Sequence, residues 1–376
     1  MVFCDAGKKN KAERRVGKIK DARQPKYIME DDDMAKDVTM RDIAKKMGVS
    51  TVTVSKALNN KEGVGNTLRT SIRKKAEEMG YKFTLANKAL REDASKTVGV
   101  LVDALYVVIN KMKNTSPFYL RMYQNVVLAL SEYGYSAILE VITDEMIDRQ
   151  KLPKVLSDNK IDSLVVMGPI RGNYAELLKN NGLPVVYLDF YDEDGETPCV
   201  VTDNTYGVYM LTKYLIDNGH RKIAFVGSID ATPSILDRYL GYCRALLANH
   251  IVPQETYLIP DRGDDGLFIE FVLPDKEQMP TAFVCNCDDA GYVLMERLRQ
   301  EGYRIPEDIS VVGFDNYTFL NFAYPRLTTI EVDVVEMADR AVDLLVGMMR
   351  GEDRAGSRIV VNGRFISGNS VAERKM

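Results

Sequence analysis

Residues 38–59 carry the clearest chemical signal in the sequence, and they read VTMRDIAKKMGVSTVTVSKALN. Gly48 permits a tight turn after a first helix, and Ser50 is a good N-cap for a second helix. In that second helix Val54 and Ala57 are expected to point inward, which leaves polar side chains facing outward near its start. The pattern predicts a helix-turn-helix whose second helix enters the major groove of DNA. The alternative is an ordinary hairpin of two helices.

A basic third helix is predicted at Asn66–Met79, where Ile72 and Ala76 give it a core face. Residues 34–97 hold 14 Lys and Arg against 7 Asp and Glu, a balance of +7. Residues 98–376 carry −13, so the net charge of −4 for the whole chain hides a basic module joined to an acidic one. A compact basic excess is typical of polyanion binding, although a solvated helical face would give the same count.

Beyond Thr97 the pattern changes to short apolar runs separated by stretches of helical spacing. This alternation predicts parallel sheets built from βαβ units, and the number of runs favours two α/β lobes. Several runs are apolar throughout, as expected for strands that are covered on both faces. We interpret residues 194–198 as a crossover between the lobes. The predicted strands are Val98–Val102, Ser136–Ile142, Ser163–Met167, Pro184–Leu188, Lys222–Val226, Thr281–Cys285 and Ile309–Phe314, and the predicted helices are Tyr119–Tyr133, Tyr206–Asn218, Tyr239–Asn249 and Ala290–Glu301.

The composition limits the kind of protein that the chain can form. With 376 residues, 45% apolar and 28% charged, it is expected to be a soluble globular protein of two or three domains. It holds no run of 18 apolar residues and no apolar segment typical of a secretory signal, so we predict a cytoplasmic protein without membrane contact. The counts of two His and five Cys disfavour a His-rich metal enzyme and a disulfide framework. Cys285 and Cys287 are interpreted as packing residues, and no cofactor or metal is predicted.

The two ends of the chain differ from its body. Residues 1–33 lack hydrophobic periodicity and are predicted to be a disordered tail, with Met34 as the suggested native start and the tail as an extension. The chain ends soon after the last expected strand without a Leu heptad, so a tetramerising tail is not expected.

The order of these features resembles the lactose-repressor (LacI/GalR-type) family of bacterial transcription regulators over about residues 38–370. The resemblance implies an N-terminal all-α helix-turn-helix domain, followed by an α/β effector domain with parallel sheets in the two-lobed arrangement of periplasmic binding proteins. The motifs that carry it are DIA-x3-GVS-x3-VS-x2-LN (42–59), GY (80–81), ALR (89–91), SKTVGV (95–100), GHRKIAFVG (219–227), DR and GY (237–238 and 241–242), PTAF (280–283), IPEDISVVGFDN (305–316) and PRLTTI (325–330).

The resemblance also implies which residues contact DNA. Thr51, Val52 and Lys56 would read bases in the major groove. Lys56 stands where the family usually has Arg, and a Lys cannot form a bidentate fork with guanine. We therefore expect an operator that differs from the family norm, or weaker discrimination at that base. The candidate phosphate contacts are Ser50, Thr53, Ser55, Asn59 and Arg69.

A hinge helix at residues 87–91 is implied next, where Leu90 would act as a wedge that kinks the operator from its minor groove. A lone Leu at helical spacing would otherwise be interpreted as a core residue. This sequence departs from the family here, because Phe83-Thr84 replaces the usual Pro-Asn and Asn87 replaces a usual Ala. These departures affect how readily the hinge helix would order.

The body is expected to hold a small effector at the carboxyl ends of its strands. The resemblance implies that Arg238 would grip ligand hydroxyls with its planar fork and that Asp315 would accept hydrogen bonds from a second pair of hydroxyls. Asp315 also follows the strand Ile309–Phe314, which places it at the carboxyl end of a strand. The alternative for the Asp residues is a helix N-cap or a surface carboxylate. Because the chain has no Trp, Phe or Tyr must supply any stacking. The further candidates for effector binding are Phe118, Asp189, Phe190, Ser234 and Asp289.

These features predict a homodimeric regulator that binds double-stranded operator DNA at a near-palindromic site and responds to a small molecule. We interpret it as a repressor of carbohydrate-utilisation genes with a sugar effector, and a purine or nucleoside stays open. It is not expected to be an enzyme, since no nucleophile–base set or phosphate loop is present. The alternative is a sugar-binding receptor on the same body fold. The predicted domains are the tail (1–33), the helix-turn-helix (34–82), the hinge (83–97) and the two-lobed body (98–376), whose first lobe takes about 98–198 and 328–350 and whose second lobe takes about 199–327 and 351–376.

Overall fold

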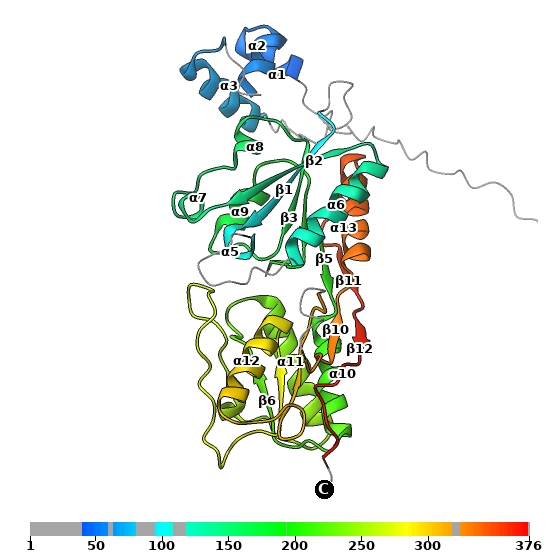
Figure 1. The fold of residues 1–376 in the computed structure, drawn as a ribbon. Helices are drawn as coiled ribbons and strands as arrows, with labels where there is room; N and C mark the ends of the chain where they lie inside the picture. Colours follow the sequence, from blue (N-terminus) through cyan, green and yellow to red (C-terminus); the bar gives the residue numbers. More distant parts are fainter. Residues whose placement is uncertain are drawn as a thin grey trace, which may run out of the picture. The chain divides into compact units, whose positions relative to one another are not determined.

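The computed structural model describes residues 40–58, 63–79, 95–107, 118–192, 194–317 and 324–374. Contacts between residues divide the chain into two units, Met1–Lys82 and Phe83–Met376 (Figure 1). We call them the N-terminal unit and the C-terminal unit. The predicted tail and the predicted hinge helix lie outside the described residues.

The N-terminal unit is built from three helices: α1 (Met40–Met47), α2 (Thr51–Leu58) and α3 (Asn66–Glu78). Gly48 adopts a φ of +67° between the first two helices, a conformation that glycine reaches without strain. A small core holds the three helices together, and its buried members are Ile43, Ala44, Val54, Ala57, Val64, Ile72 and Ala76. The predicted helix-turn-helix and its third helix are confirmed.

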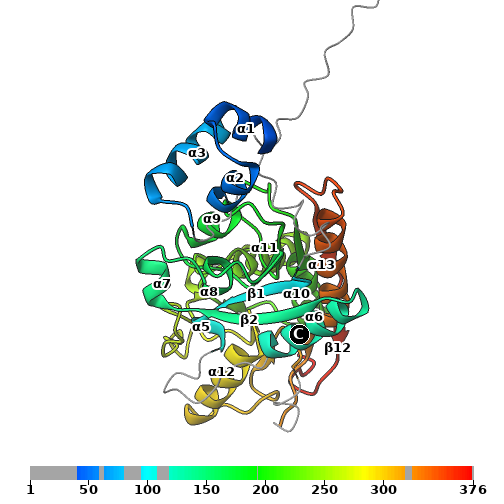
Figure 2. The same ribbon diagram turned by 90° about the horizontal axis from the view of Figure 1, so that it is seen from above.

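The first lobe of the C-terminal unit contains a six-stranded parallel sheet in the order β11-β5-β4-β3-β1-β2. Figure 2 shows β1 and β2 side by side. Alternate residues of the central strands pack on opposite faces, so that Val165 contacts the core beneath α6 and α13, whereas Val166 contacts the core on the other face. Burial on both faces explains why these strands are apolar throughout. The elements are β1 (Thr97–Asp103), β2 (Ser136–Ile142), β3 (Ser163–Met167), β4 (Val185–Leu188), β5 (Cys199–Thr202), β11 (Arg358–Val361), α5 (Ala104–Val107), α6 (Phe118–Glu132), α7 (Asp144–Asp148), α8 (Lys154–Ser157), α9 (Tyr174–Lys179) and α13 (Val334–Met349).

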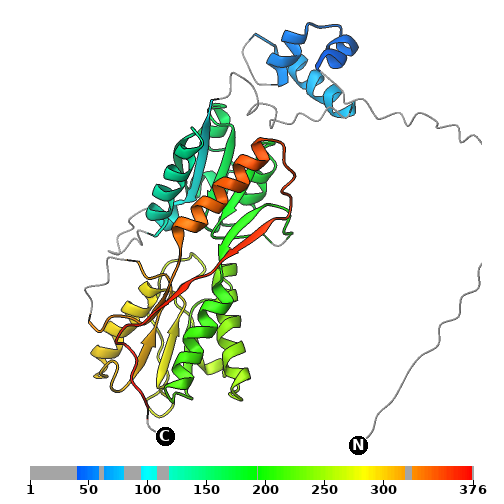
Figure 3. The ribbon, with the colours of Figure 1, turned by 90° about the vertical axis from the view of Figure 1, so that its right-hand side faces the viewer.

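The second lobe contains a four-stranded parallel sheet in the order β7-β6-β8-β9. Side chains of α10 and α11 share a core with one face of this sheet, and side chains of α12 share a core with the other. A short antiparallel pair, β10 with β12, lies between the lobes in Figure 3. The elements are α10 (Asn204–Asp217), β6 (Ile223–Val226), α11 (Pro233–Ala248), the 3₁₀ turn Glu255–Tyr257, β7 (Leu258–Ile259), β8 (Ala282–Cys285), α12 (Asp288–Gln300), β9 (Ser310–Val312), β10 (Thr329–Glu331) and β12 (Arg364–Ile366).

The predicted boundaries between the lobes are wrong at two places. Residues 199–202 and 358–361 were assigned to the second lobe, but as β5 and β11 they pair within the first sheet. Residues 194–198 are therefore the connection between β4 and β5 rather than a crossover between lobes. The chain crosses from one lobe to the other after β5, between β10 and α13, and between β11 and β12 (Figure 3).

Candidate functional site

The start of α2 is capped by a side chain. Ser50 Oγ accepts a hydrogen bond from the backbone N–H of Thr53 at 3.0 Å, which satisfies a donor that the first helical turn leaves free. The Thr53 hydroxyl lies 2.8 Å from the same oxygen. Both predicted phosphate contacts therefore lie at the helix N-terminus, where the helix dipole favours an anion.

One face of α2 is buried and the other faces solvent. Val54 and Ala57 are fully buried, whereas Thr51 is exposed and 64% of Val52 is accessible. Ser55 and Lys56 are partly exposed. An exposed Val side chain is unfavourable in water, but it is suited to contact the methyl group of thymine. The predicted base-reading residues thus share the free face of this helix.

Arg69 has a structural contact that the sequence does not indicate. Its Nη2 donates to the backbone carbonyl of Val64 at 3.3 Å, which ties α3 to the segment that precedes it. The side chain stays partly exposed, so a phosphate contact is still possible from this position. Asn59 and Leu90, also predicted to contact DNA, lie outside the described residues.

In the C-terminal unit, Arg238 on α11 is buried and held on several sides. Its Nε donates to Asn204 Oδ1 at 2.7 Å and its Nη1 donates to the carbonyl of Asn286 at 2.6 Å. The guanidinium carbon lies 4.0 Å from the centroid of the Phe314 ring, a cation–π contact. These contacts fix the plane of the guanidinium and leave Nη2 directed at Asp315, whose Oδ1 is 3.5 Å away.

Asp315 follows β9 in a backbone conformation that few residues other than glycine adopt, with a φ of +107°. Its backbone N–H donates to the carbonyl of Ile330 at 2.8 Å, and the buried carboxyl of Asp288 accepts from the next N–H, that of Asn316. Strained backbone that is held by its surroundings in this way is typical of functional sites. Burial raises the pKa of Asp315 to about 7 against the opposing effect of Arg238, so the carboxyl is poised to exchange a proton near neutral pH.

Asp189 occupies the corresponding position after β4 in the first lobe, also at positive φ (+68°). Its Oδ2 accepts from the Tyr119 hydroxyl at 2.8 Å, while its Oδ1 is buried without a hydrogen-bond partner among the described residues. Burial raises its pKa to about 6, and the positive charge of Arg238 in the second lobe opposes that rise. We call Tyr119, Asp189, Arg238 and Asp315 the inner cluster.

Two further polar groups border the inner cluster. Asp289 is bonded to the Tyr317 hydroxyl, and burial raises its pKa to about 6. Arg262 pairs with Asp261, with Nη2 at 2.7 Å from Oδ2, and the charges of both Asp289 and Arg262 act on Asp315. The structure thus brings Asp189, Arg238, Asp289 and Asp315 together, as the sequence predicts for effector-binding residues.

Three other predicted effector residues are placed differently. Phe190 stacks on Tyr187 at a centroid distance of 4.2 Å inside the core of the first lobe, and Phe118 is buried in the core beneath α6. Both rings fill core space, and their role in effector binding stays a prediction. Ser234 lies in the first turn of α11, one turn before Arg238, with its hydroxyl 2.9 Å from Thr232 Oγ1.

Four residues that border the inner cluster were not predicted from the sequence: Tyr106, Asn204, Arg262 and Asn286. Asn286 directly follows β8 and Tyr106 follows β1, so both lie at carboxyl ends of strands, a signal that was available in the sequence. Asn204 and Arg262 approach the site only through tertiary packing, which residue spacing does not reveal.

A second contact joins the lobes beside the inner cluster. Asp237, the neighbour of Arg238 on α11, accepts from the Tyr191 hydroxyl at 3.2 Å and lies 3.7 Å from Nη2 of Arg358. The guanidinium of Arg358 in turn lies 4.0 Å from the centroid of the Tyr191 ring. Tyr191 and Arg358 belong to the first lobe and Asp237 to the second, so this group links the lobes next to the residue predicted to hold the effector.

The stability of the protein should depend on the proton of Asp315. Its folded pKa of about 7 lies above the ordinary 3.8, so the folded state keeps a proton that the unfolded state has already lost, and stability falls as pH rises from 5 to 8. In wild type the free energy of unfolding should fall between pH 5 and pH 8, and Asp315→Asn should make that fall smaller by about 2 kcal/mol. Urea unfolding of both proteins at pH 5 and pH 8 measures it. The prediction is contradicted if Asp315→Asn changes the free energy of unfolding by the same amount at both pH values.

The described residues contain no group of three or more His, Cys, Asp or Glu that could hold a metal ion. Cys285 is fully buried in the core of the second lobe, and Cys287 Sγ accepts from the N–H of Ala290 at 3.5 Å at the start of α12. Over the same part of the chain, no helix has the length and apolar character needed to cross a membrane.

A helix-turn-helix and a two-lobed α/β body with a polar site between its lobes define a DNA-binding protein with a ligand-sensing domain. Residues 39–82 match the family model of bacterial regulatory proteins of the lacI family, and residues 212–371 match that of a periplasmic-binding-protein-like domain. The chain belongs to the LacI family of DNA-binding transcriptional regulators. This family consists of regulators and not of enzymes, in agreement with the sequence analysis.

Relatives match along most of the chain. The HTH-type transcriptional repressor PurR of Vibrio atlanticus (strain LGP32) is 28% identical over 320 residues, covering 84% of this chain and 93% of the relative. CytR of Escherichia coli (strain K12), also an HTH-type transcriptional repressor, is 27% identical over 340 residues, or 89% and 96% of the two chains. Among solved structures, the complex of the transcriptional regulator CelR with cellobiose is 25% identical, with a TM-score of 0.63 and coverage of 89% and 99%. The lac repressor dimer bound to operator and the anti-inducer ONPF, 20% identical with a TM-score of 0.60 and coverage of 90% and 100%, shares the fold.

Proposed function

We propose that this LacI-family regulator is a repressor of carbohydrate-utilisation genes, which binds a near-palindromic operator as a homodimer and changes its DNA affinity when a sugar binds between its lobes. One observation carries the proposal: an exposed recognition helix and a buried Arg–Asp cluster between two lobes occur in one chain. Because a repressor acts on the chromosome, the proposal implies a cytoplasmic protein.

The free face of α2 supports the proposed DNA contacts. Thr51, Val52 and Lys56 are the proposed base readers, since they share the accessible face of the helix. The other proposed contacts are those to phosphates by Ser50, Thr53, Ser55, Asn59 and Arg69, and a minor-groove wedge at Leu90.

The inner cluster supports a polyhydroxyl effector. The fork of Arg238 supplies donors, and the carboxyls of Asp189 and Asp315 supply acceptors, the combination that reads vicinal hydroxyl groups. The solved complex of the similar regulator CelR with cellobiose supports a sugar, whereas the relatives named PurR and CytR leave a purine or nucleoside as the second candidate.

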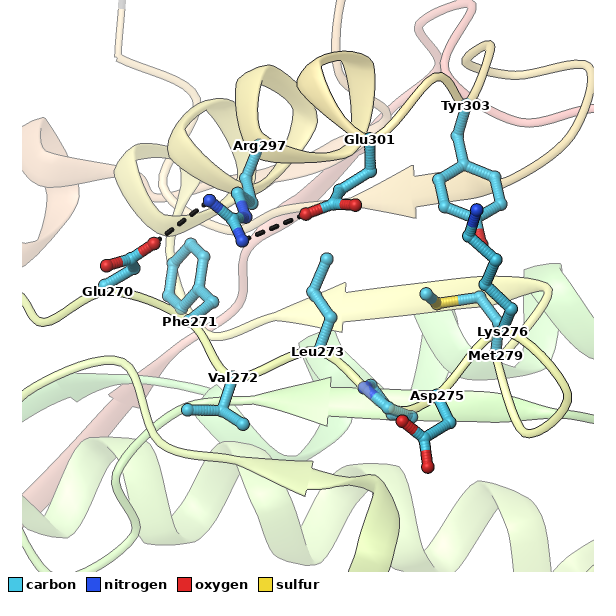
Figure 4. Close-up of a pocket in the computed structure, with 11 residues that line it drawn as sticks. Glu270, Phe271, Val272, Leu273, Asp275, Lys276, Met279, Arg297, Glu301 and Tyr303 are labelled. Atoms are coloured by element: carbon cyan, nitrogen blue, oxygen red, sulfur yellow. Dashed lines mark hydrogen bonds and ion pairs between the residues drawn. The ribbon is translucent and has the colours of Figure 1, made fainter.

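The proposed dimer is supported by apolar side chains that the single chain leaves in solvent. In the first lobe, Leu120 and Leu128 are exposed on one face of α6. In the second lobe, Val272 is 83% exposed beside α12, at a hollow of about 450 Å³ where Arg297 bridges Glu270 and Glu301 (Figure 4). A second copy that covers both faces would remove this apolar surface from water.

The link between effector and DNA would be the angle between the lobes. A ligand that bridges the inner cluster favours one lobe arrangement, and only that difference in affinity can shift DNA binding. The chain crosses between the lobes three times, so the lobes stay connected when the angle between them changes. The sign of the response, release from DNA or tighter binding, is an outcome of the experiment.

The test is a gel-shift titration of the full chain with DNA from its own upstream region. We expect specific binding to a near-palindrome that weakens with salt, and a change in affinity when sugars are added. A scrambled palindrome of the same length is the control. If no DNA of this region is bound specifically, with or without sugars, the proposed operator is excluded, and sugar binding without DNA binding would favour a sugar-binding receptor. If DNA is bound but only purines or nucleosides alter the affinity, the sugar is excluded.

A further inference from the structure

A second compartment opens between the lobes beside the inner cluster, with a cavity volume of about 490 Å³. The first lobe lines it with Leu105, Tyr106 and Arg171, and the second lobe lines it with residues 227–232, with Leu258 and Pro260, and with the loop that holds Arg262 and Gly266. We call it the outer compartment. None of the residues predicted from the sequence to bind the effector lines it.

The outer compartment and the inner cluster share walls. The Tyr106 ring lies 5.2 Å from that of Tyr119, whose hydroxyl is bonded to Asp189, and the charge of Asp189 acts on the Tyr106 hydroxyl. On the second lobe, Arg262 Nη2 lies 3.5 Å from Asn286 Oδ1, and the carbonyl of Asn286 accepts from Arg238. Tyr106 and Asn286 thus connect the lining of the outer compartment to the residues of the inner cluster.

The two guanidinium groups that line the outer compartment are paired with carboxylates of the protein. Arg171 donates to Asp103 with Nε at 2.9 Å and Nη2 at 2.8 Å, and also to Asp144. Arg262 is paired with Asp261 through two of its nitrogens. Each guanidinium is already ion-paired with a carboxylate. Among the described residues that line the compartment, no unpaired cation is therefore left to attract a phosphate or a carboxylate of the ligand.

The inner cluster has acceptors in excess. Asp189 is only 7% exposed, and its Oδ1 has no partner among the described residues. Arg238 is the one cation that offers Asp315 an ion pair in the described part of the chain. A buried acceptor that lacks a donor costs free energy until a ligand supplies one, and an anionic ligand would meet repulsion there.

We propose that the effector is an uncharged saccharide of two or more units, one unit held by the inner cluster and the next lying in the outer compartment against Tyr106. This inference rests on the proposed sugar response and specifies its ligand. The outer compartment alone has the volume of a pocket for a small organic molecule. Tyr106 and Ile229 supply the apolar wall, and the paired Arg171 and Arg262 supply donors to hydroxyl groups.

The experiment compares ligands of two lengths in the full chain. Isothermal titration and thermal shift are measured with glucose, galactose and xylose, with cellobiose, lactose, maltose and trehalose, and with glucose 6-phosphate. We expect at least one disaccharide to bind more tightly than its component monosaccharide, and the phosphate ester to bind more weakly than glucose.

Ile229→Trp tests the compartment itself because the indole would fill it while leaving the inner cluster unchanged. We expect the affinity for the disaccharide to fall by about tenfold, with the affinity for the monosaccharide unchanged. Val252→Trp is the matched control, since Val252 is 75% exposed on the same lobe and lines neither compartment. Ala231→Trp, at an exposed lining position, repeats the test if Ile229→Trp does not fold.

The outcomes separate this inference from the proposed function. If saccharides bind but length has no effect, or if Ile229→Trp weakens both lengths equally, the two-compartment inference fails and the sugar response stands. Tighter binding of the phosphate ester would overturn the uncharged ligand. If no saccharide of either length binds, the proposed sugar response fails as well.

Discussion

Replacing Arg238 with Met abolishes the response to the effector while leaving operator binding intact. Met keeps the volume and the unbranched shape of the Arg side chain but removes its donors. The guanidinium makes its contacts to Asn204 and Asn286 within the protein, and Nη2 remains directed at Asp315, toward the space where a ligand would lie. A hydrogen bond from a charged group contributes roughly 1.5–3 kcal/mol, so the loss of two such bonds to a ligand weakens binding by at least about 100-fold.

The measurement pairs effector titration with a gel shift on the same preparation. Arg244→Met is the matched control, because Arg244 is exposed on the same helix with its guanidinium 5.3 Å from the Tyr209 ring. The control should keep both activities. An Arg238→Met protein that melts as the wild type does and still binds the effector with wild-type affinity would rule out Arg238 as the ligand-holding residue.

Truncating Ile72 to Ala eliminates sequence-specific DNA binding and leaves effector binding unchanged. Ile72 is fully buried in α3, and the core it shares has seven buried members among the residues that the structure describes. Removing a buried Ile side chain of this size costs about 2–5 kcal/mol, which is a large share of the stability of a unit this small. The helix-turn-helix would then be largely unfolded at 37 °C, and α2 could not present its face to DNA.

Calorimetry should resolve this effect as the loss or lowering of one transition, with the effector-dependent transition of the C-terminal unit unchanged. Leu68→Ala is the control on the same helix, since Leu68 is exposed and its truncation opens no cavity. Wild-type operator affinity for Ile72→Ala would show that the packing of these three helices is not needed for DNA binding. A parallel fall in the effector-dependent transition would show that the two units do not fold independently.

The elements that the sequence predicted correctly are those with strong local signals. The turn at Gly48, the cap at Ser50 and the inward spacing of Val54 and Ala57 each follow from one short segment. Six of the seven predicted strands are apolar over their central residues because both faces of each sheet are covered, whereas β2 is a partly exposed edge strand. Local chemistry was therefore sufficient for the helix-turn-helix and for the centres of both sheets.

The strands that the sequence analysis missed are short or lie at the edge of a sheet. β11 (Arg358–Val361) alternates exposed and less exposed residues because it is an edge strand, and β7 has two residues. Since β5 and β11 are partners only through long-range pairing, no local pattern could assign them to the first lobe. The wrong lobe boundaries follow directly from this.

The candidate site was predictable to the extent that strand ends reveal it. Asp189 and Asp315 each follow a strand, and Arg238 came from the family resemblance. Phe190 follows Asp189 in sequence, but its ring turns back into the core against Tyr187, because neighbouring side chains at a strand end point to opposite sides. Asn204 enters the site from α10, whose packing against α11 is a tertiary property.

The three crossings between the lobes have a consequence for the order in which the molecule forms during synthesis. The N-terminal unit ends at Lys82, but the first sheet is complete only when β11 (358–361) has been added. At about 5–20 residues per second, a ribosome needs roughly 15 to 60 s to make the intervening chain. The helix-turn-helix can therefore fold while both lobes still lack their last strands. The growing chain can contact DNA before it can sense a ligand. The edge of β5 stays unpaired until β11 has been synthesised.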